Sequence, residues 1–241
     1  DERRKATRVP ADVTFRTKGE IAAQLLRDAH ADGVPLGEVL LADADYGRLP
    51  ELRRLAIELG MNCAVGVDRS QPIWDRGGVW TTPMSAGEFA SYLPGARYRR
   101  LSWRDATSGR PLSARFAFER VYVTAEGREP RRGRDRLVWL VIEWRDGADA
   151  PSHFYLSDLP HGTPRKRLVR TLKERWRTER LYEDLKGEVG FDHFEGRSWP
   201  GWHHHMSVVL CAYAVLVAER VMAFSPSPSR RPSRRPLGLA A

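Results

Sequence analysis

The 241-residue sequence predicts a mixed α/β fold, and three observations support this prediction. Helix and strand patterns alternate from Thr17 to Val67, which is the order typical of α/β proteins. From Asp68 to Pro160 the pattern changes to turns and short alternating runs typical of strands. Two helical patterns follow, and the second is mostly apolar. We therefore expect an α/β core, a β-rich segment and two closing helices.

The first helix is expected to begin after Thr17. Thr17 and Glu20 form a capping-box pattern, which satisfies the first backbone N–H groups of a helix. Gly33 ends this helical pattern. Residues 1–16, which precede the helix, are polar, so we expect them to be irregular. The apolar positions expected to share one helix face are Ile21, Ala22, Leu25, Leu26 and Ala29.

A strand is expected at Val39 to Ala42, followed by a helix and a second short strand at Cys63 to Val67. Pro50 suits the first turn of that helix and Gly60 ends it. The positions expected to face the core are Leu52, Leu55, Ala56 and Leu59.

Asp43 follows the first strand in the segment LLADADYG. Ligands in open α/β sheets collect outside the carboxyl ends of strands, so Asp43 is well placed to hold a metal or a substrate. The alternative is that Asp43 and Asp45 cap the turn before the next helix. Both interpretations stay open at this point.

The β-rich segment contains two clear strand patterns, ARFAFERVYVT and LVWLVIEW. A paired set of such strands is expected to cover the edge of the core sheet.

A helix is expected from about Pro164 to about Glu188, after the loop HGTPRKR. At ~100° per residue, four of its polar residues fall within roughly a 60° arc: Arg175, Glu179, Tyr182 and Lys186. Leu168, Leu172 and Trp176 lie on or beside that arc, so Glu179 interrupts an apolar face and needs a partner. The alternative is an Arg175/Glu179 pair on a solvated helix.

Together these segments resemble the DDE transposases of bacterial insertion sequences. In that family the second catalytic Asp ends a strand and Tyr-Gly follows, as Tyr46-Gly47 follows Asp43. The third catalytic residue lies in the pattern Tyr, two residues, Arg, three residues, Glu, six residues, Lys. Arg175, Glu179 and Lys186 keep this spacing, and Leu172 replaces the Tyr. The segment GEVGFDHFEGRSWPGWHHH contains short motifs that are similar to those of one subgroup of these transposases. The resemblance runs from about Val13 to about Val221.

The resemblance implies a ribonuclease-H-like core that cleaves and transfers DNA strands at the ends of an insertion sequence. It implies that Asp43 and Glu179 are catalytic and bind Mg²⁺ (or Mn²⁺) in a two-metal site, since carboxylates suit these ions. Arg175, Tyr182 and Lys186 would contact DNA. The partners implied are the transposon ends and the target DNA, and a homodimer on DNA is a further expectation.

The family's first catalytic Asp has no counterpart in this chain. Asp1, Asp12, Asp28 and Asp32 precede Asp43, and none lies in an apolar strand pattern. We therefore expect that the first strands of the core are missing, and the alternative function is a catalytically inactive basic DNA-binding protein derived from a transposase. The expected division is 1–67 partial core, 68–160 β-rich insertion, 161–224 C-terminal core helices and 225–241 disordered basic tail.

Composition agrees with a nucleic-acid partner. Lys plus Arg number 40 against 31 Asp plus Glu, which gives a net charge of +9 and a pI near 10.0. The sequence has two cysteines, Cys63 and Cys211, and their spacing indicates neither a disulfide framework nor a cysteine zinc site. This cysteine usage suits a cytoplasmic, nucleoid-associated protein. The apolar stretch from Met206 to Val217 is expected to be too short to span a bilayer, so we expect no membrane partner.

His203, His204 and His205 suggest zinc, but consecutive helix residues point about 100° apart and cannot converge on one ion. We expect one of them to pack against the core while the others meet solvent or DNA. Trp199 and Trp202 are interpreted as core anchors, with base stacking as the alternative.

Overall fold

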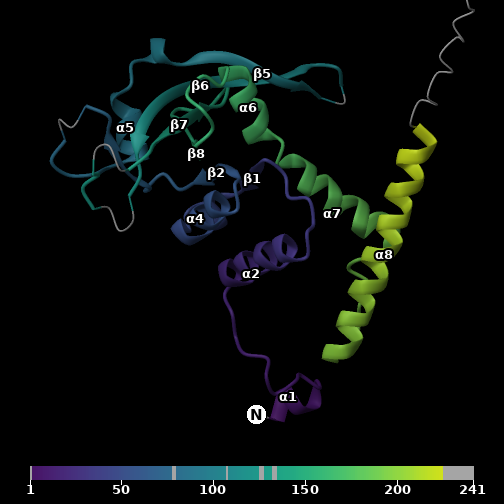
Figure 1. Ribbon diagram of the computed structural model, residues 1–241. Helices are drawn as coiled ribbons and strands as arrows, with labels where there is room; N and C mark the ends of the chain where they lie inside the picture. Colours follow the sequence, from purple (N-terminus) through teal and green to yellow (C-terminus); the bar gives the residue numbers. More distant parts are fainter. Residues whose placement is uncertain (1, 78–79, 107, 125–127, 132–134, 225–241) are drawn as a thin grey trace, which may run out of the picture. The chain divides into compact units, whose positions relative to one another are not determined.

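The computed structural model describes residues 2–77, 80–106, 108–124, 128–131 and 135–224 (Figure 1). The chain divides into two compact units, Phe15–Thr178 and the combination of Asp1–Thr14 with Glu179–Ala241. Helix α7 (Trp176–Val189) runs from the first of these units into the second.

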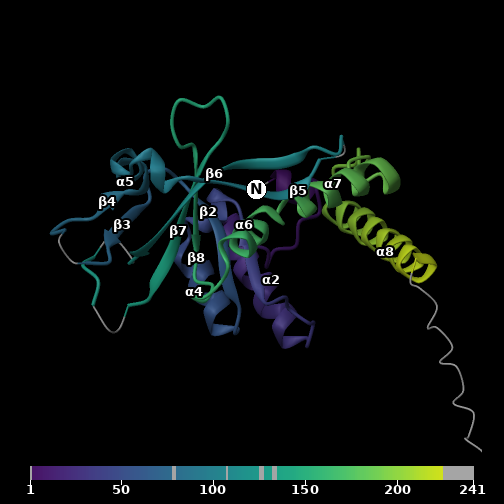
Figure 2. The same ribbon diagram turned by 90° about the horizontal axis from the view of Figure 1, so that it is seen from above.

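One eight-stranded sheet forms the centre of the unit Phe15–Thr178 (Figures 1 and 2). The strand order is β1-β2-β8-β7-β6-β3-β4, and β5 also pairs with β6. Strands β1 and β2 are parallel, and the other pairs are antiparallel. The strands are β1 (Val39–Ala42), β2 (Asn62–Val67), β3 (Pro72–Asp75), β4 (Met84–Ser85), β5 (Arg99–Asp105), β6 (Pro111–Tyr122), β7 (Leu137–Trp144) and β8 (His153–Ser157).

The mixed α/β prediction is confirmed, and so are the strands expected at ARFAFERVYVT and LVWLVIEW, which are β6 and β7. Strand β8, which lies in the range 68–160, pairs with β2. Strands of this range therefore do cover one edge of the β1–β2 pair, as expected. The ribonuclease-H-like detail and the division of the sequence into four segments stay predictions.

The two helices predicted between Thr17 and Val67 begin and end close to the predicted residues. In α2 (Lys18–Ala31), the Thr17 N–H donates to Glu20 Oε2 at 2.7 Å and the Glu20 N–H donates to Thr17 Oγ1 at 3.2 Å. Helix α4 (Pro50–Glu58) buries Leu52, Leu55 and Ala56 as expected. The predicted apolar face of α2 is partly wrong: Ala23 is buried, while Ile21 and Leu25 are exposed.

Three short helices were not expected, and one of them is α3 (Ala44–Gly47), which directly follows Asp43. Helix α1 (Glu2–Ala6) lies in the stretch predicted to be irregular, and α5 (Ala86–Tyr92) lies in the β-rich range, followed by the 3-10 turn η1 (Gly95–Arg97). Ser85 caps α5 by accepting a hydrogen bond from the Glu88 N–H at 3.1 Å. Segments this short contain too few residues to show a helical repeat in the sequence.

Helices cover both faces of the sheet. Alternate residues of a strand point to opposite faces, so Leu140 and Ile142 of β7 pack in one cluster with Ala56 of α4. Trp139 and Val141 pack on the other face against α6 (Arg165–Lys173).

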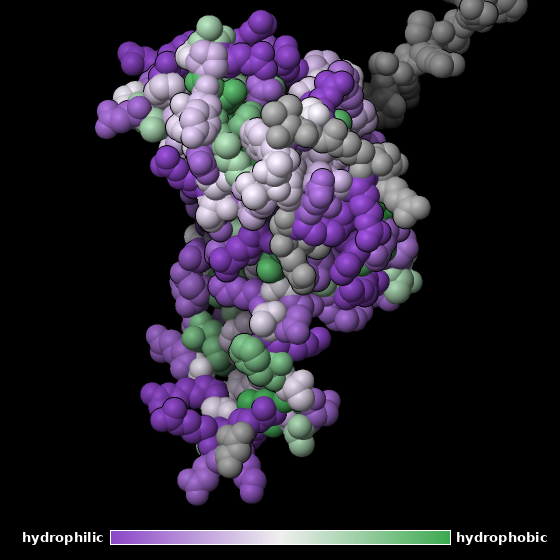
Figure 3. Space-filling model, turned by 90° about the vertical axis from the view of Figure 1, so that its left-hand side faces the viewer, coloured by the Kyte–Doolittle hydropathy of each residue, from purple (hydrophilic) through white to green (hydrophobic). Residues whose placement is uncertain are grey.

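The molecular face seen in Figure 3 is mostly hydrophilic, with hydrophobic residues in small separate groups.

The single helix predicted from Pro164 to Glu188 is wrong, because α6 ends at Lys173 and α7 begins at Trp176. The turn between them is closed by bonds of i to i+3 type, from the Arg177 N–H to Glu174 O and from the Thr178 N–H to Arg175 O, both at 2.9 Å. No Gly or Pro marks this turn in the sequence.

The second unit contains α1, most of α7 and α8 (Trp199–Phe224). The Trp199 N–H donates to Thr7 O at 2.7 Å, and Arg220 of α8 pairs with Glu188 of α7 at 2.6 Å. By length and composition alone, Trp199–Ala223 is long and apolar enough to cross a membrane, so the expectation that this segment is too short was wrong. The predicted disordered tail 225–241 lies outside the described residues.

Candidate functional site

Asp43 lies at the carboxyl end of β1 and is the N-cap of the short helix α3 (Ala44–Gly47). Its Oδ1 accepts hydrogen bonds from the Asp45 N–H at 3.1 Å and the Tyr46 N–H at 3.3 Å. Asp43 is therefore a helix cap, but the capping interpretation is correct only in part, because the helix capped is α3 and not α4, and Asp45 lies inside α3. The other oxygen, Oδ2, has no hydrogen bond or ion pair within the part of the chain that the structure describes. A half-buried carboxylate with one unengaged oxygen can still bind a ligand.

Two glycines bring α3 directly onto β2. A β-carbon on Gly47 would lie 1.9 Å from the Gly66 carbonyl oxygen, so no larger residue fits at position 47. A β-carbon on Gly66 would lie 3.1 Å from the Ala44 nitrogen and 3.3 Å from the Asp43 carbonyl carbon. These contacts explain the Gly after Tyr46 and fix the backbone of Asp43 against the carboxyl end of β2. Sequence analysis missed Gly66, although a glycine inside a strand often marks such a close approach.

A buried charged cluster lies where α6 ends. Glu143 of β7 is 1% exposed, and it accepts hydrogen bonds from Lys173 Nζ and from Tyr155 Oη, the latter at 2.7 Å. Lys173 Nζ also donates to Tyr155 Oη at 2.9 Å. Burial alone would raise the pKa of Glu143, but the ammonium and hydrogen bond of Lys173 hold it below its ordinary value. The pair therefore fastens the last turn of α6 to the sheet.

This fastening brings Arg175 to the same edge of the sheet as Asp43. Tyr155 is opposite Gly66 in the β8–β2 register, and Gly66 lies against Asp43. Arg175 follows Lys173 by two residues. Burial raises the pKa of the Tyr155 hydroxyl, and the charge of Arg175 opposes that rise. On the other side of the turn, the Arg104 guanidinium lies 4.0 Å from the ring centroid of Trp176. Arg175 is half-buried in this turn and does not belong to either helix.

Glu179, Tyr182 and Lys186 are all exposed positions of α7. They are three and four residues apart, so they share one face of the helix. The buried residue of α7 is Leu185. The expectation that Glu179 interrupts a core face was therefore wrong, because Leu168 and Leu172 belong to α6 and are buried there. Glu179 belongs to a different unit from Asp43, so their convergence stays a prediction.

The three histidines of α8 have separate surroundings. His205 is half-buried, with its Nε2 3.1 Å from Gly190 O and its ring 5.5 Å from that of Phe194. His203 and His204 are exposed, and the His203 ring contacts Trp199. Trp199 is half-buried and Trp202 is exposed. Among the described residues, no three His, Cys, Asp or Glu side chains gather in a group that could hold a metal ion.

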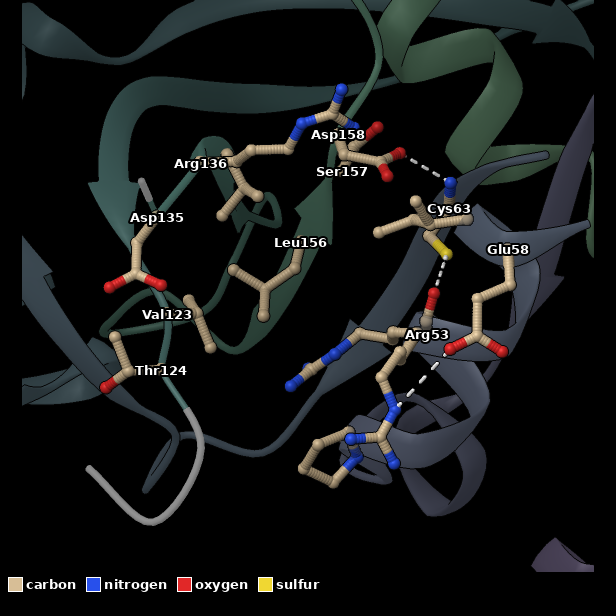
Figure 4. Close-up of a pocket in the computed structure, with 14 residues that line it drawn as sticks. Arg53, Glu58, Cys63, Val123, Thr124, Asp135, Arg136, Leu156, Ser157 and Asp158 are labelled. Atoms are coloured by element: carbon tan, nitrogen blue, oxygen red, sulfur yellow. Dashed lines mark hydrogen bonds and ion pairs between the residues drawn. The ribbon is translucent and has the colours of Figure 1, made fainter. Parts of the chain in front are cut away.

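A cavity of about 270 Å³ lies between α4 and the strands β7 and β8 (Figure 4). Asp43 is not among its lining residues. The Asp158 carboxylate accepts a hydrogen bond from the Cys63 N–H at 2.6 Å, and burial raises the pKa of the Cys63 thiol to about 12. A thiol with so high a pKa is a poor nucleophile, so this cavity offers no cysteine chemistry.

Residues 1–150 match the family described as DDE superfamily endonuclease. The match includes Asp43, Gly47 and Gly66 but ends before the helix that carries Glu179. No curated protein matches the chain.

Proposed function

Because the chain belongs to the DDE superfamily of endonucleases, we propose that it cleaves and transfers DNA strands at the ends of an insertion sequence. The family acts on DNA, and the basic charge of the chain suits that partner. We place its action in the cytoplasm, at the nucleoid.

The observation that carries this proposal is the position of Asp43. Its backbone is fixed by the contact of α3 with β2, and one of its carboxylate oxygens is unengaged among the described residues. A carboxylate held by a rigid turn at the carboxyl end of a strand is suited to metal binding, because its orientation costs little to maintain.

Asp43 and Glu179 would hold Mg²⁺ or Mn²⁺, since hard cations prefer carboxylate oxygens. When bound, such ions would activate a water or a 3′-hydroxyl for attack on a phosphodiester and stabilise the leaving oxygen. Asp43 Oδ2 fits this role. The unengaged oxygen can accept an ion while Oδ1 continues to cap α3.

Arg175, Tyr182 and Lys186 would hold the DNA end. Arg175 is at the same sheet edge as Asp43, and its charge there would fix a phosphate beside the reacting group. Tyr182 and Lys186 share the exposed face of α7 with Glu179 and would contact the same strand.

The alternative is a basic DNA-binding protein without catalytic activity. It is favoured by the lack of a three-carboxylate group among the described residues, because two carboxylates hold a pair of divalent ions poorly. We therefore expect weak metal binding and slow cleavage at most from this chain. A homodimer on DNA is compatible with either function.

Metal binding and cleavage distinguish the two functions. Titration with Mn²⁺ should show binding that Asp43→Asn and Glu179→Gln each weaken, while the exposed neighbour Asp45→Asn serves as the matched control. Any Mn²⁺-dependent nicking of DNA should disappear with the first two substitutions and persist with the third. If Mn²⁺ binding is unchanged in both Asp43→Asn and Glu179→Gln, the metal site is not there, and the non-catalytic function is supported.

A further inference from the structure

A basic groove lies on the α6 face of the sheet, at the start of α6. Its volume is about 350 Å³, and its lining includes three arginines and a histidine beside aromatic rings. A smaller hollow of about 90 Å³ shares Phe118 and Arg165 with it and adds Arg97 and Arg99. We call this site the basic groove, and its main lining residues are Arg76, Arg120, Trp139, His161 and Arg165. All five belong to the unit Phe15–Thr178.

Arg120 is the most unusual residue of the basic groove. Its Nη2 donates a hydrogen bond to Leu137 O, but Nε and Nη1 are buried and have no hydrogen-bond partner among the described residues. The guanidinium lies 4.9 Å from the ring centroid of Trp139. Buried donors without acceptors cost free energy, so a small shift of the guanidinium that turns them toward an anion in the groove would be favoured. Burial lowers the pKa of Arg120, and the charge of Arg76 lowers it further.

The carboxylates that line the basic groove are engaged with other groups. Glu119 pairs with Arg97, with Nε 3.1 Å from Oε1, and Asp75 accepts a hydrogen bond from the Trp80 N–H at 3.1 Å. Within the described parts of the chain, none of Arg76, Arg120 and Arg165 forms an ion pair with a carboxylate. The groove is therefore positive in charge, and its ligand should be an anion.

Helix α6 extends this positive surface. Its sequence RKRLVRTLK contains no acidic residue, and Arg165, Lys166, Arg167 and Arg170 are exposed while Leu168, Val169 and Leu172 are buried. Nine helical residues span about 13 Å, which is about four base-pair steps of B-DNA. The far end of α6 leads into the turn with Arg175, at the sheet edge of Asp43.

We propose that the basic groove binds a backbone phosphate of DNA, with the half-buried Arg120 as its anchor, and that α6 guides the strand from the groove to the Asp43 edge. The proposal rests on the proposed function only in taking DNA as the partner. Arg165 supplies a second charge at the mouth of the groove. The His161 ring, stacked on Trp139 with centroids 5.6 Å apart, provides a flat wall beside the phosphate.

Binding of the full chain to a short labelled duplex, measured over a range of salt concentrations, tests this proposal. Arg120→Gln and Arg165→Gln each remove one phosphate contact, which should weaken binding roughly eightfold at ~0.1 M salt and lower the salt slope by about 1. Arg27→Gln removes the same charge from the exposed surface of α2 and should change affinity less than about twofold. Thermal melts identify variants that do not fold, and Arg165→Gln decides the outcome if Arg120→Gln unfolds.

Two results would overturn the proposal. The first is that folded Arg120→Gln and Arg165→Gln bind DNA as well as Arg27→Gln does. The second is that they lose binding of inorganic phosphate but bind DNA normally, which would make the basic groove a site for a small anion. Because no metal is needed and no cleavage is measured, these results are independent of whether Asp43 and Glu179 bind Mn²⁺.

Discussion

Gly47 and Gly66 meet backbone to backbone, so that a β-carbon on Gly47 would lie 1.9 Å from the Gly66 carbonyl oxygen. The turn that follows Asp43 therefore rests on β2 with no space for a side chain between them. This contact holds the Asp43 carboxylate at the end of β1, and every role proposed for Asp43 depends on it.

Gly47→Ala should destabilise the protein, because the new methyl group forces α3 away from β2. Overpacking of this kind costs typically about 1–3 kcal/mol. Gly37→Ala is the matched control, since a β-carbon there has nothing within 4 Å. Urea unfolding of the two variants gives the comparison, and equal stability would show that the α3 contact is not needed.

The sequence allowed the elements around Asp43 to be predicted because their signals are local. The Thr17/Glu20 capping box, Pro50 at a helix start and the alternation in LVWLVIEW each act within a few residues. The turn between α6 and α7 could not be predicted in this way. It depends on Lys173 reaching Glu143 and on Arg104 covering Trp176, and both contacts join residues far apart in the chain.

The unpredicted turn between α6 and α7 also explains why Glu179 was wrongly expected to lie on an apolar helix face. The apolar arc that included Leu168 and Leu172 assumed one continuous helix, and the turn at Arg175 separates them from α7. Arg120 was also missed. An arginine inside a strand pattern gives no sign of whether its donors find acceptors.

Lys173→Met should be strongly destabilising, because the buried Glu143 carboxylate then keeps only the hydrogen bond from Tyr155 and the 3.4 Å contact of the exposed Arg145. Removing one partner of a buried ion pair costs about 3–5 kcal/mol, whereas replacing both with apolar residues is often nearly neutral. The double variant Glu143→Leu/Lys173→Met should therefore recover most of the loss. Unfolding free energies of the single and double variants test this, and additive losses would contradict the pairing.

The stability of the protein should also depend on pH through Glu143. The pKa of Glu143 is lowered in the folded state, so its contribution is present above the ordinary value of 4.5 and is lost as the pH falls through the folded-state value. Glu143→Gln lacks this contribution. The stability difference between the wild type and Glu143→Gln should therefore shrink as the pH falls below 4.5, and a constant difference would show that Glu143 does not titrate as inferred.

The separation of the Asp43 and Glu179 carboxylates, in a crystal structure of the chain with Mn²⁺ and a DNA end, tests the central claim most directly. Two metals about 4 Å apart, each about 2 Å from its ligand oxygens, require the two carboxylates to lie within ~10 Å of each other in one cleft. We predict that separation, with Asp43 Oδ2 facing the metal. A separation beyond ~10 Å would show that these two residues do not form one metal site.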